Sequence, residues 1–155
     1  MSYTSLHRLL LSLLSGLLLL SPLTQAENSA QLKTEEILVY KSPTCGCCTA
    51  WTKYLEDNGF TVKWRDLDNL DRIKTQYGVT PELASCHTAV IDGYVIEGHV
   101  PAGDIRRLLL ERPAVKGLSV PGMPPLSPGM SDGEPKHFDV LTFDAAGHTT
   151  VFSSY

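Results

Sequence analysis

The chain has 155 residues, with 13 basic and 17 acidic side chains and a formal net charge of −4. This weakly acidic balance, without any run of basic residues, argues against binding to nucleic acid. After the N-terminal segment, no apolar stretch approaches the roughly 20 residues that a membrane-spanning helix needs. We therefore expect no membrane association once that segment is removed.

The first 26 residues have the pattern of a secretory signal peptide. Arg8 supplies a positive charge, the apolar run Leu9–Leu20 follows, and Thr24 and Ala26 are small residues at the −3 and −1 positions of a cleavage site. The apolar run is short for a membrane span, so an uncleaved anchor is the less favoured alternative. We expect residues 1–26 to be removed on export, leaving one modest soluble domain at residues 27–155.

The first part of this domain has the pattern of a βαβ unit. Ile37–Tyr40 is a compact apolar strand, and from Thr49 the apolar residues recur at helical spacing until Asn58-Gly59, a pair that typically ends a helix. Phe60–Trp64 alternates like a second strand. Strand, helix and strand over this length imply two parallel strands with the helix as their crossover.

Two further helices and a hairpin are expected next. Asp68–Tyr77 predicts a short charged helix, and a second helix is predicted to begin at Ala102 or Gly103 and to end at Arg112. Between them, Ser85–Ile91 and Tyr94–Glu97 flank Asp92-Gly93, a strong signal for a two-residue hairpin turn.

Composition changes at the start of the C-terminal region. Gly117–Pro135 is rich in proline and glycine and predicts a long loop, and long ordered loops in small domains usually serve a function. His137–Phe143 and His148–Phe152 then alternate around Gly147 and predict a terminal hairpin.

The order of these elements predicts an α/β fold of the thioredoxin-like type. The thioredoxin-like domain would cover residues 27–116, and residues 117–155 would be a C-terminal extension with the loop and the hairpin. In that fold, the strand that opens the β-hairpin begins beside the turn after the first strand, at a position usually held by a cis-proline. Ser85-Cys86 occupies that place, so we expect Cys86 to lie next to Cys45 and Cys48.

Three of the four cysteines fall in the run Cys45-Gly46-Cys47-Cys48, at the expected helix start. Unpaired amide groups and the positive end of the helix dipole favour thiolate there. Cys45 and Cys48 have the two-residue spacing of a redox disulfide, which makes them candidate catalytic residues. Such a pair leaves the third thiol unused. Because adjacent cysteines such as Cys47 and Cys48 rarely bridge each other, two purely structural disulfides are less favoured.

The four sulfurs of Cys45, Cys47, Cys48 and Cys86 also form a candidate metal site. A four-thiolate zinc site is one option, although three ligands within four residues wrap poorly around one tetrahedral ion. Cu(I) is soft, accepts low coordination numbers and tolerates bridging sulfur, so copper is the favoured metal. For Cys86 a role as a small buried hydrophobe stays open.

Thioether and imidazole groups could complete this site. Met123 and Met130 both lie in the Pro/Gly-rich loop, and a thioether binds copper but is a poor ligand for zinc. Packing of the loop on the core is the alternative for both. His99 could also reach the site. His87 should face away from Cys86 if both lie on a strand, so we expect a packed side chain there.

Four stretches of the sequence carry a resemblance to a known family: Tyr40–Cys48, Ser85–Ala89, Gly93–Ala102 and Val120–Pro124. In these stretches the chain resembles the CopG-type copper-resistance proteins of Gram-negative periplasms. The resemblance implies a thioredoxin-like domain whose C-terminal extension helps to bind copper. It also implies several copper ions bridged by cysteine sulfur, and interconversion of Cu(I) and Cu(II).

The sequence thus predicts a periplasmic copper-binding protein of copper tolerance, with more than one copper ion and a candidate copper oxidoreductase activity. Its predicted metal ligands are Cys45, Cys47, Cys48, Cys86, Met123, His99 and Met130. A thiol–disulfide oxidoreductase that uses Cys45 and Cys48 and a passive copper chaperone are the alternatives. Besides copper ions, the candidate partners are periplasmic copper efflux or carrier proteins.

Overall fold

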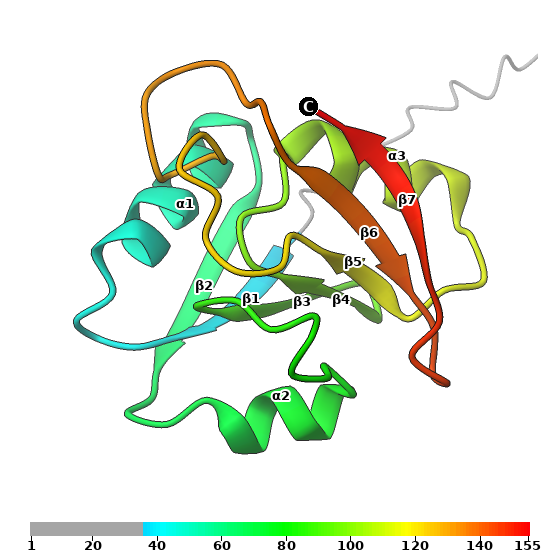
Figure 1. Cartoon of the computed structure of the whole chain (residues 1–155). Helices are drawn as coiled ribbons and strands as arrows, with labels where there is room; N and C mark the ends of the chain where they lie inside the picture. Colours follow the sequence, from blue (N-terminus) through cyan, green and yellow to red (C-terminus); the bar gives the residue numbers. More distant parts are fainter. Residues whose placement is uncertain (1–35) are drawn as a thin grey trace, which may run out of the picture. The chain divides into compact units, whose positions relative to one another are not determined.

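The computed structural model describes residues 36–155, so the predicted signal peptide lies outside the described residues. Strands and helices follow one another as shown in Figure 1: β1 (Glu36–Lys41), α1 (Gly46–Asp57), β2 (Thr61–Asp66), α2 (Asp71–Tyr77), β3 (Thr88–Ile91), β4 (Tyr94–Glu97), α3 (Ala102–Glu111), β5 (Gly117–Ser119), β6 (Asp139–Phe143) and β7 (Thr149–Ser154). Within these residues no helix is long and apolar enough to cross a membrane.

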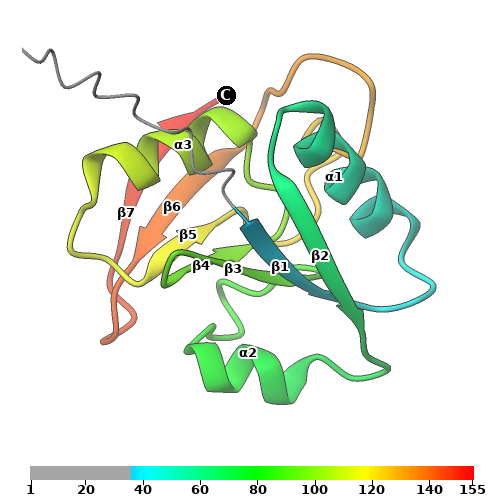
Figure 2. The same ribbon diagram turned by 180° about the vertical axis from the view of Figure 1, so that it is seen from behind.

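The seven strands form one mixed sheet in the order β2-β1-β3-β4-β5-β6-β7. The pairs β1–β2 and β4–β5 are parallel, and the other neighbours are antiparallel. Helices α1 and α3 cover one face of the sheet and α2 covers the other (Figures 1 and 2). The predicted α/β class, and the order βαβ, helix, hairpin, helix, are confirmed.

The larger hydrophobic core lies between the sheet and the two helices α1 and α3. Trp51 and Leu55 of α1 and Ile105 and Leu108 of α3 are fully buried in it. Burying each such side chain contributes about 1.5–3 kcal/mol. The indole N–H of Trp51 also donates to the carbonyl of Val100 at 3.0 Å. These contacts fix α1, and with it the cysteine run at its start.

Turn chemistry explains the elements that the sequence predicts well. Asp92 and Gly93 have φ angles of 46° and 87°, as a primed hairpin turn requires, and β4 has the predicted bounds. Helix α1 begins at Gly46, earlier than the expected Thr49, because the Cys45 sulfur accepts a hydrogen bond from the N–H of Cys48 and caps the helix.

Two expectations about the strands are wrong: one strand lies within a predicted loop, and another begins later than expected. The predicted loop at Gly117–Pro135 begins with a short strand, β5, which pairs with β4 in parallel and with β6 in antiparallel orientation. A Cβ on Gly117 would lie 1.9 Å from the Val95 carbonyl oxygen, so this close strand pairing requires glycine. In addition, β3 begins at Thr88 and not at Ser85, which places Cys86 at a bend before the strand.

Candidate metal centre

The turn after β1 presents three sulfur atoms at the start of α1. The N–H of Cys45 donates to the Ser42 carbonyl, which closes the turn, and Cys45 is the N-cap residue of the helix. Cys45 and Cys48 are joined by a disulfide. Cys48 is fully buried, while Cys45 and Cys47 are half-buried. The structure is therefore the oxidised form of a helix-start cysteine pair.

Cys86 is distant from this turn in the sequence but lies next to it in the structure, as predicted. Its sulfur lies 4.0 Å from the Cys47 sulfur, which lies 3.5 Å from that of Cys45. All four sulfurs lie within 4.8 Å of one another. Cys47 and Cys86 are free thiols, so the arrangement with two structural disulfides is not present.

Two buried imidazoles flank Cys86. His99 places Nε2 at 3.0 Å from the Cys86 sulfur, and its Nδ1 lies 2.7 Å from the carbonyl oxygen of Pro128. Because a carbonyl only accepts, Nδ1 carries the proton, and the Nε2 lone pair faces the sulfur. The structure thus brings the predicted candidate His99 to the sulfurs, in the tautomer that a metal ligand at Nε2 needs.

His87 does not face away from Cys86, so that expectation is wrong. Its Nδ1 lies 3.3 Å from the Cys86 sulfur, and its ring packs against Trp51 at a tilt of 39°, with 4.3 Å between centroids. The alternation argument fails because Cys86 sits at a bend before β3 begins. Its packing is as expected, since it is fully buried. Among the described residues, the buried Nε2 of His87 has no hydrogen-bond partner.

Burial shapes the protonation of this centre. It raises the pKa of the Cys86 thiol to about 12, and the neighbouring Cys47 sulfur adds to this effect. Burial also lowers the pKa of His99, and it lowers the pKa of His87 far below its usual value, where the charges of His99 and Lys74 act in the same direction. In the metal-free protein the Cys86 thiol is thus protonated and both imidazoles are neutral. A bound cation would favour the thiolate.

The Pro/Gly-rich loop lies beside the centre. The N–H of Gly122 donates to the Ala84 carbonyl, and the Ser85 hydroxyl donates to the Gly122 carbonyl, so the loop is attached to the segment that carries Cys86. Further along the loop, Gly129 packs on the Trp51 backbone so closely that a Cβ would lie 2.7 Å from the Trp51 nitrogen.

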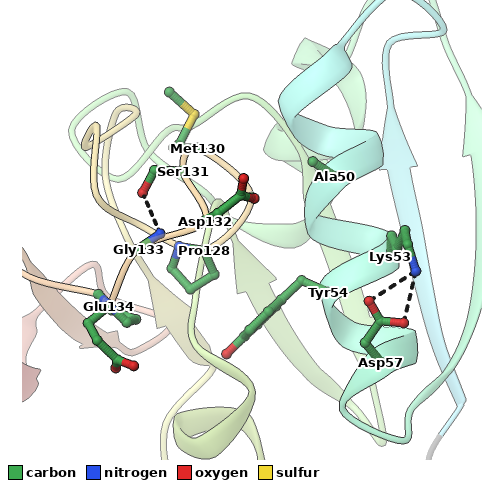
Figure 3. Close-up of a pocket in the computed structure, with 12 residues that line it drawn as sticks. Ala50, Lys53, Tyr54, Asp57, Pro128, Met130, Ser131, Asp132, Gly133 and Glu134 are labelled. Atoms are coloured by element: carbon green, nitrogen blue, oxygen red, sulfur yellow. Dashed lines mark hydrogen bonds and ion pairs between the residues drawn. The ribbon is translucent and has the colours of Figure 1, made fainter.

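The two methionines of the loop occupy different surroundings. Met123 directly follows Gly122 and is 55% exposed. Met130 lines a cleft of about 670 Å³ between α1 and residues 128–135, where Lys53 and Asp57 form an ion pair on the α1 side (Figure 3). These surroundings do not test a ligand role, so both methionines stay predicted ligands.

Comparison with known proteins adds two findings. Residues 83–130 match the family described as "Protein of unknown function, DUF411", a stretch that contains Cys86, His87, His99 and both loop methionines but not the cysteine run at Cys45–Cys48. No curated protein matches the chain.

Two solved structures are similar to most of the chain. The structure named "Copper resistance protein copG- Form 2" is 41% identical and covers 79% of this chain and 99% of its own, with a TM-score of 0.74. The structure named "Copper resistance protein copG- Form 1" is 42% identical and covers 77% of this chain and 96% of its own, with a TM-score of 0.72.

Proposed function

Since this chain belongs to the CopG family of copper resistance proteins, we propose that it binds copper at the cluster formed by Cys45, Cys47, Cys48 and Cys86 and acts in copper tolerance. The observation that carries the proposal is the convergence of four sulfurs, from two distant parts of the chain, within 4.8 Å. His99 is the additional ligand that the geometry favours most, and Met123 and Met130 are further candidates from the loop.

The donor set suits Cu(I) by its chemistry. Thiolates and thioethers are soft ligands that select Cu(I), and imidazole also binds copper. Cys86, His87 and His99 form a second group whose ligand atoms lie within 4.8 Å of one another, and it shares Cys86 with the four-cysteine group. A shared cysteine sulfur can bridge metal ions. We therefore expect more than one copper per chain.

The disulfide supports a route for interconverting the two copper oxidation states. When Cys45 and Cys48 are reduced, each thiolate can give one electron to a Cu(II) ion, which forms the Cys45–Cys48 disulfide and leaves two Cu(I) ions. A dithiol reductant would restore the pair by thiol–disulfide exchange. Cys45 and Cys48 would then be catalytic residues and copper the substrate, in a protein that works in the periplasm beside copper efflux or carrier proteins.

A thiol–disulfide oxidoreductase is the second candidate function, and the Cys45–Cys48 disulfide at the start of α1 is the observation that favours it. Cys45 is the more accessible sulfur and would be the attacking thiol, with buried Cys48 as the resolving one. A passive chaperone would bind the same copper without any change of the disulfide.

An anaerobic titration tests the proposed copper cluster. Fully reduced protein is titrated with Cu(I) against a competing chelator, and the disulfide form is titrated in parallel. We expect more than one tightly bound Cu(I) in the reduced form and fewer in the disulfide form, because oxidation removes two of four thiolates. A plateau at one copper, with zinc bound more tightly, would contradict the cluster.

The redox step has its own test. Cu(II) is added to the reduced protein without oxygen, and Cu(I) and the disulfide are counted by chelator absorbance and mass spectrometry. We expect two Cu(I) for each Cys45–Cys48 disulfide, and loss of this ratio in Cys45→Ser. Copper that binds with no disulfide formed would favour the passive chaperone.

A further inference from the structure

A buried carboxylate lies on the face of the sheet opposite α1. Glu97, the last residue of β4, is fully buried. Its Oε1 accepts from the backbone N–H of Ser85 at 2.6 Å and forms an ion pair with Lys74 of α2. Its Oε2 accepts from the hydroxyl of Thr88 at 2.7 Å. Lys74 also donates to the Thr88 hydroxyl at 3.2 Å.

Two of the groups that donate hydrogen bonds to Glu97, the N–H of Ser85 and the hydroxyl of Thr88, lie on either side of the Cys86-His87 pair in the sequence. Ser85 is one residue before Cys86, and Thr88 is one residue after His87 and begins β3. The intervening backbone has irregular structure, with a bend at Cys86 and one backbone–backbone hydrogen bond, from the N–H of Gly98 to the His87 carbonyl. A short segment without regular pairing takes its conformation from the contacts at its two ends.

We propose that Glu97 is a positioning residue for Cys86. Glu97 anchors the backbone before and after the Cys86-His87 pair and so directs the Cys86 sulfur toward Cys47 and His99. The copper-related part of this inference rests on the proposed function, while the placement of the thiol does not. Lys74 supplies the counter-charge that a buried carboxylate needs, so α2 contributes to the centre from the far side of the sheet (Figure 1).

The stability of the fold alone gives a weaker account of this arrangement. The cost of desolvating a buried ion pair offsets much of its attraction, so such a pair is weak evidence for stabilisation. Its directional hydrogen bonds do define geometry, as the outer contacts of metal ligands do when they orient those ligands. Glu97 makes such contacts at both ends of the Cys86 segment.

The oxidised, metal-free protein offers an internal control, because Cys47 and Cys86 are its two free thiols. We would measure their alkylation by iodoacetamide, residue by residue, using peptide mass spectrometry. In Glu97→Leu, which removes both contacts, the Cys86-to-Cys47 rate ratio should rise at least about tenfold, because a half-buried thiol becomes accessible. Glu97→Gln can still accept from Ser85 and donate to Thr88, so its ratio should stay within about twofold of the wild type.

Two further variants keep the test decisive. Asp104→Asn alters another buried carboxylate, which is far from Cys86 in the sequence and accepts a hydrogen bond from the Tyr155 hydroxyl at 2.8 Å. This variant should lower the stability of the protein without changing the alkylation ratio. Thr88→Val removes only one of the two anchors and should give an intermediate ratio, which decides the matter if Glu97→Leu does not fold. An unchanged ratio in the folded Glu97→Leu or Thr88→Val variant, or equal ratios in the Gln and Leu variants, would overturn the inference.

Cu(I) affinity then connects the placement to the metal. Glu97→Leu should bind Cu(I) about tenfold more weakly than the wild type, as expected for loss of a supporting contact, and Asp104→Asn should not. An unchanged affinity in a variant whose Cys86 has become reactive would overturn a role in copper binding. If the wild type itself binds no copper, the proposed function fails, and the alkylation ratio still tests the placement.

Discussion

The centre has two parts that are held in different ways. The helix half consists of Cys45, Cys47 and Cys48 and lies within one turn at the start of α1, fixed by local backbone hydrogen bonds. The strand half consists of Cys86, His87 and His99, and its two imidazoles are fully buried. Contacts from α1, the loop and β4 hold the strand half in place.

This difference separates two chemical tasks. Cys45 and Cys48 are close in sequence and Cys45 is half-buried, so they can form and break a disulfide with little movement of the rest of the fold. The thiol and two imidazoles of the strand half are fixed by buried contacts that do not involve the disulfide bond, so we expect them to keep their geometry when it is reduced. We therefore expect the helix half to change state during function and the strand half to serve as its fixed counterpart.

Removing the sulfur of the strand half should have the largest effect. Cys86→Ser should weaken Cu(I) binding by at least about tenfold, because the ligand that closes the site from a distant part of the chain is lost. Chelator competition measures the affinity, and the free energy of unfolding of the metal-free protein is the control. Unchanged copper affinity with lowered stability would show that Cys86 is a packing residue.

Cys47→Ser should break the helix half while sparing its disulfide. Thiol–disulfide exchange needs only Cys45 and Cys48, so the variant should still form and exchange this bond. Copper binding should fall by about tenfold, because Cys47 lies between the other sulfurs, 3.5 Å from Cys45 and 4.0 Å from Cys86. Robust disulfide reductase turnover in both wild type and variant, with intact copper binding, would favour the oxidoreductase instead.

His99→Gln should show whether the strand half supplies more than sulfur. The glutamine amide can still donate to the Pro128 carbonyl, so the loop contact is kept while the imidazole is lost. We expect a several-fold decrease in Cu(I) affinity, smaller than in Cys86→Ser because sulfur is the softer ligand. A matched change at the exposed His148, His148→Gln, should leave the affinity unchanged.

The helix half could be predicted from the sequence because its signals are local. The spacing of Cys45 and Cys48 at the end of an apolar strand predicts a helix-start pair, and the structure shows their disulfide. The position of Cys86 followed from one local turn at Asp92-Gly93 together with the order of elements. The thioredoxin-like assignment itself stays a prediction, while the mixed α/β sheet is confirmed.

The strand half could be predicted only in part because its contacts are long-range. His87 was expected to face away, since no local pattern shows that β3 starts at Thr88 and leaves a bend before it. The β5 strand was hidden by the glycine and proline content of its surroundings, since its pairing with Val95–Glu97 depends on residues far away in the sequence. Buried polar contacts such as that of Glu97 leave no periodic signal.

Acid should weaken the strand half before the helix half. Burial lowers the pKa of both His87 and His99 in the folded protein, whereas the pKa of an unfolded histidine is about 6.5. The unfolded chain therefore binds more protons below this pH. The stability that depends on neutral imidazoles is complete above about pH 6.5 and is lost as the pH falls, by up to about 1.4 kcal/mol per pH unit for each histidine.

Urea unfolding of the metal-free disulfide form between pH 7.5 and pH 5 measures this slope. His99→Gln removes one of the two titrating groups and should reduce the slope without changing its sign. A stability that is flat over this range in the wild type would show that the imidazoles are not held neutral by burial.

The smallest effect is expected from substitutions in the exposed Pro/Gly-rich loop, which belongs to neither half of the centre. Met123 is 55% exposed, so Met123→Leu, which keeps volume and apolarity, should cost well under about 1.5 kcal/mol in the metal-free protein. A ligand role would not survive the change, because leucine has no sulfur to offer Cu(I). We expect altered copper absorption bands or faster copper oxidation at nearly unchanged stability.

Met130→Leu, in the cleft beside α1, is the matched control and should change less. Identical copper spectra and oxidation kinetics for wild type and Met123→Leu would exclude this thioether as a ligand and leave the buried imidazoles and Met130 as the candidate neutral donors beside the four sulfurs.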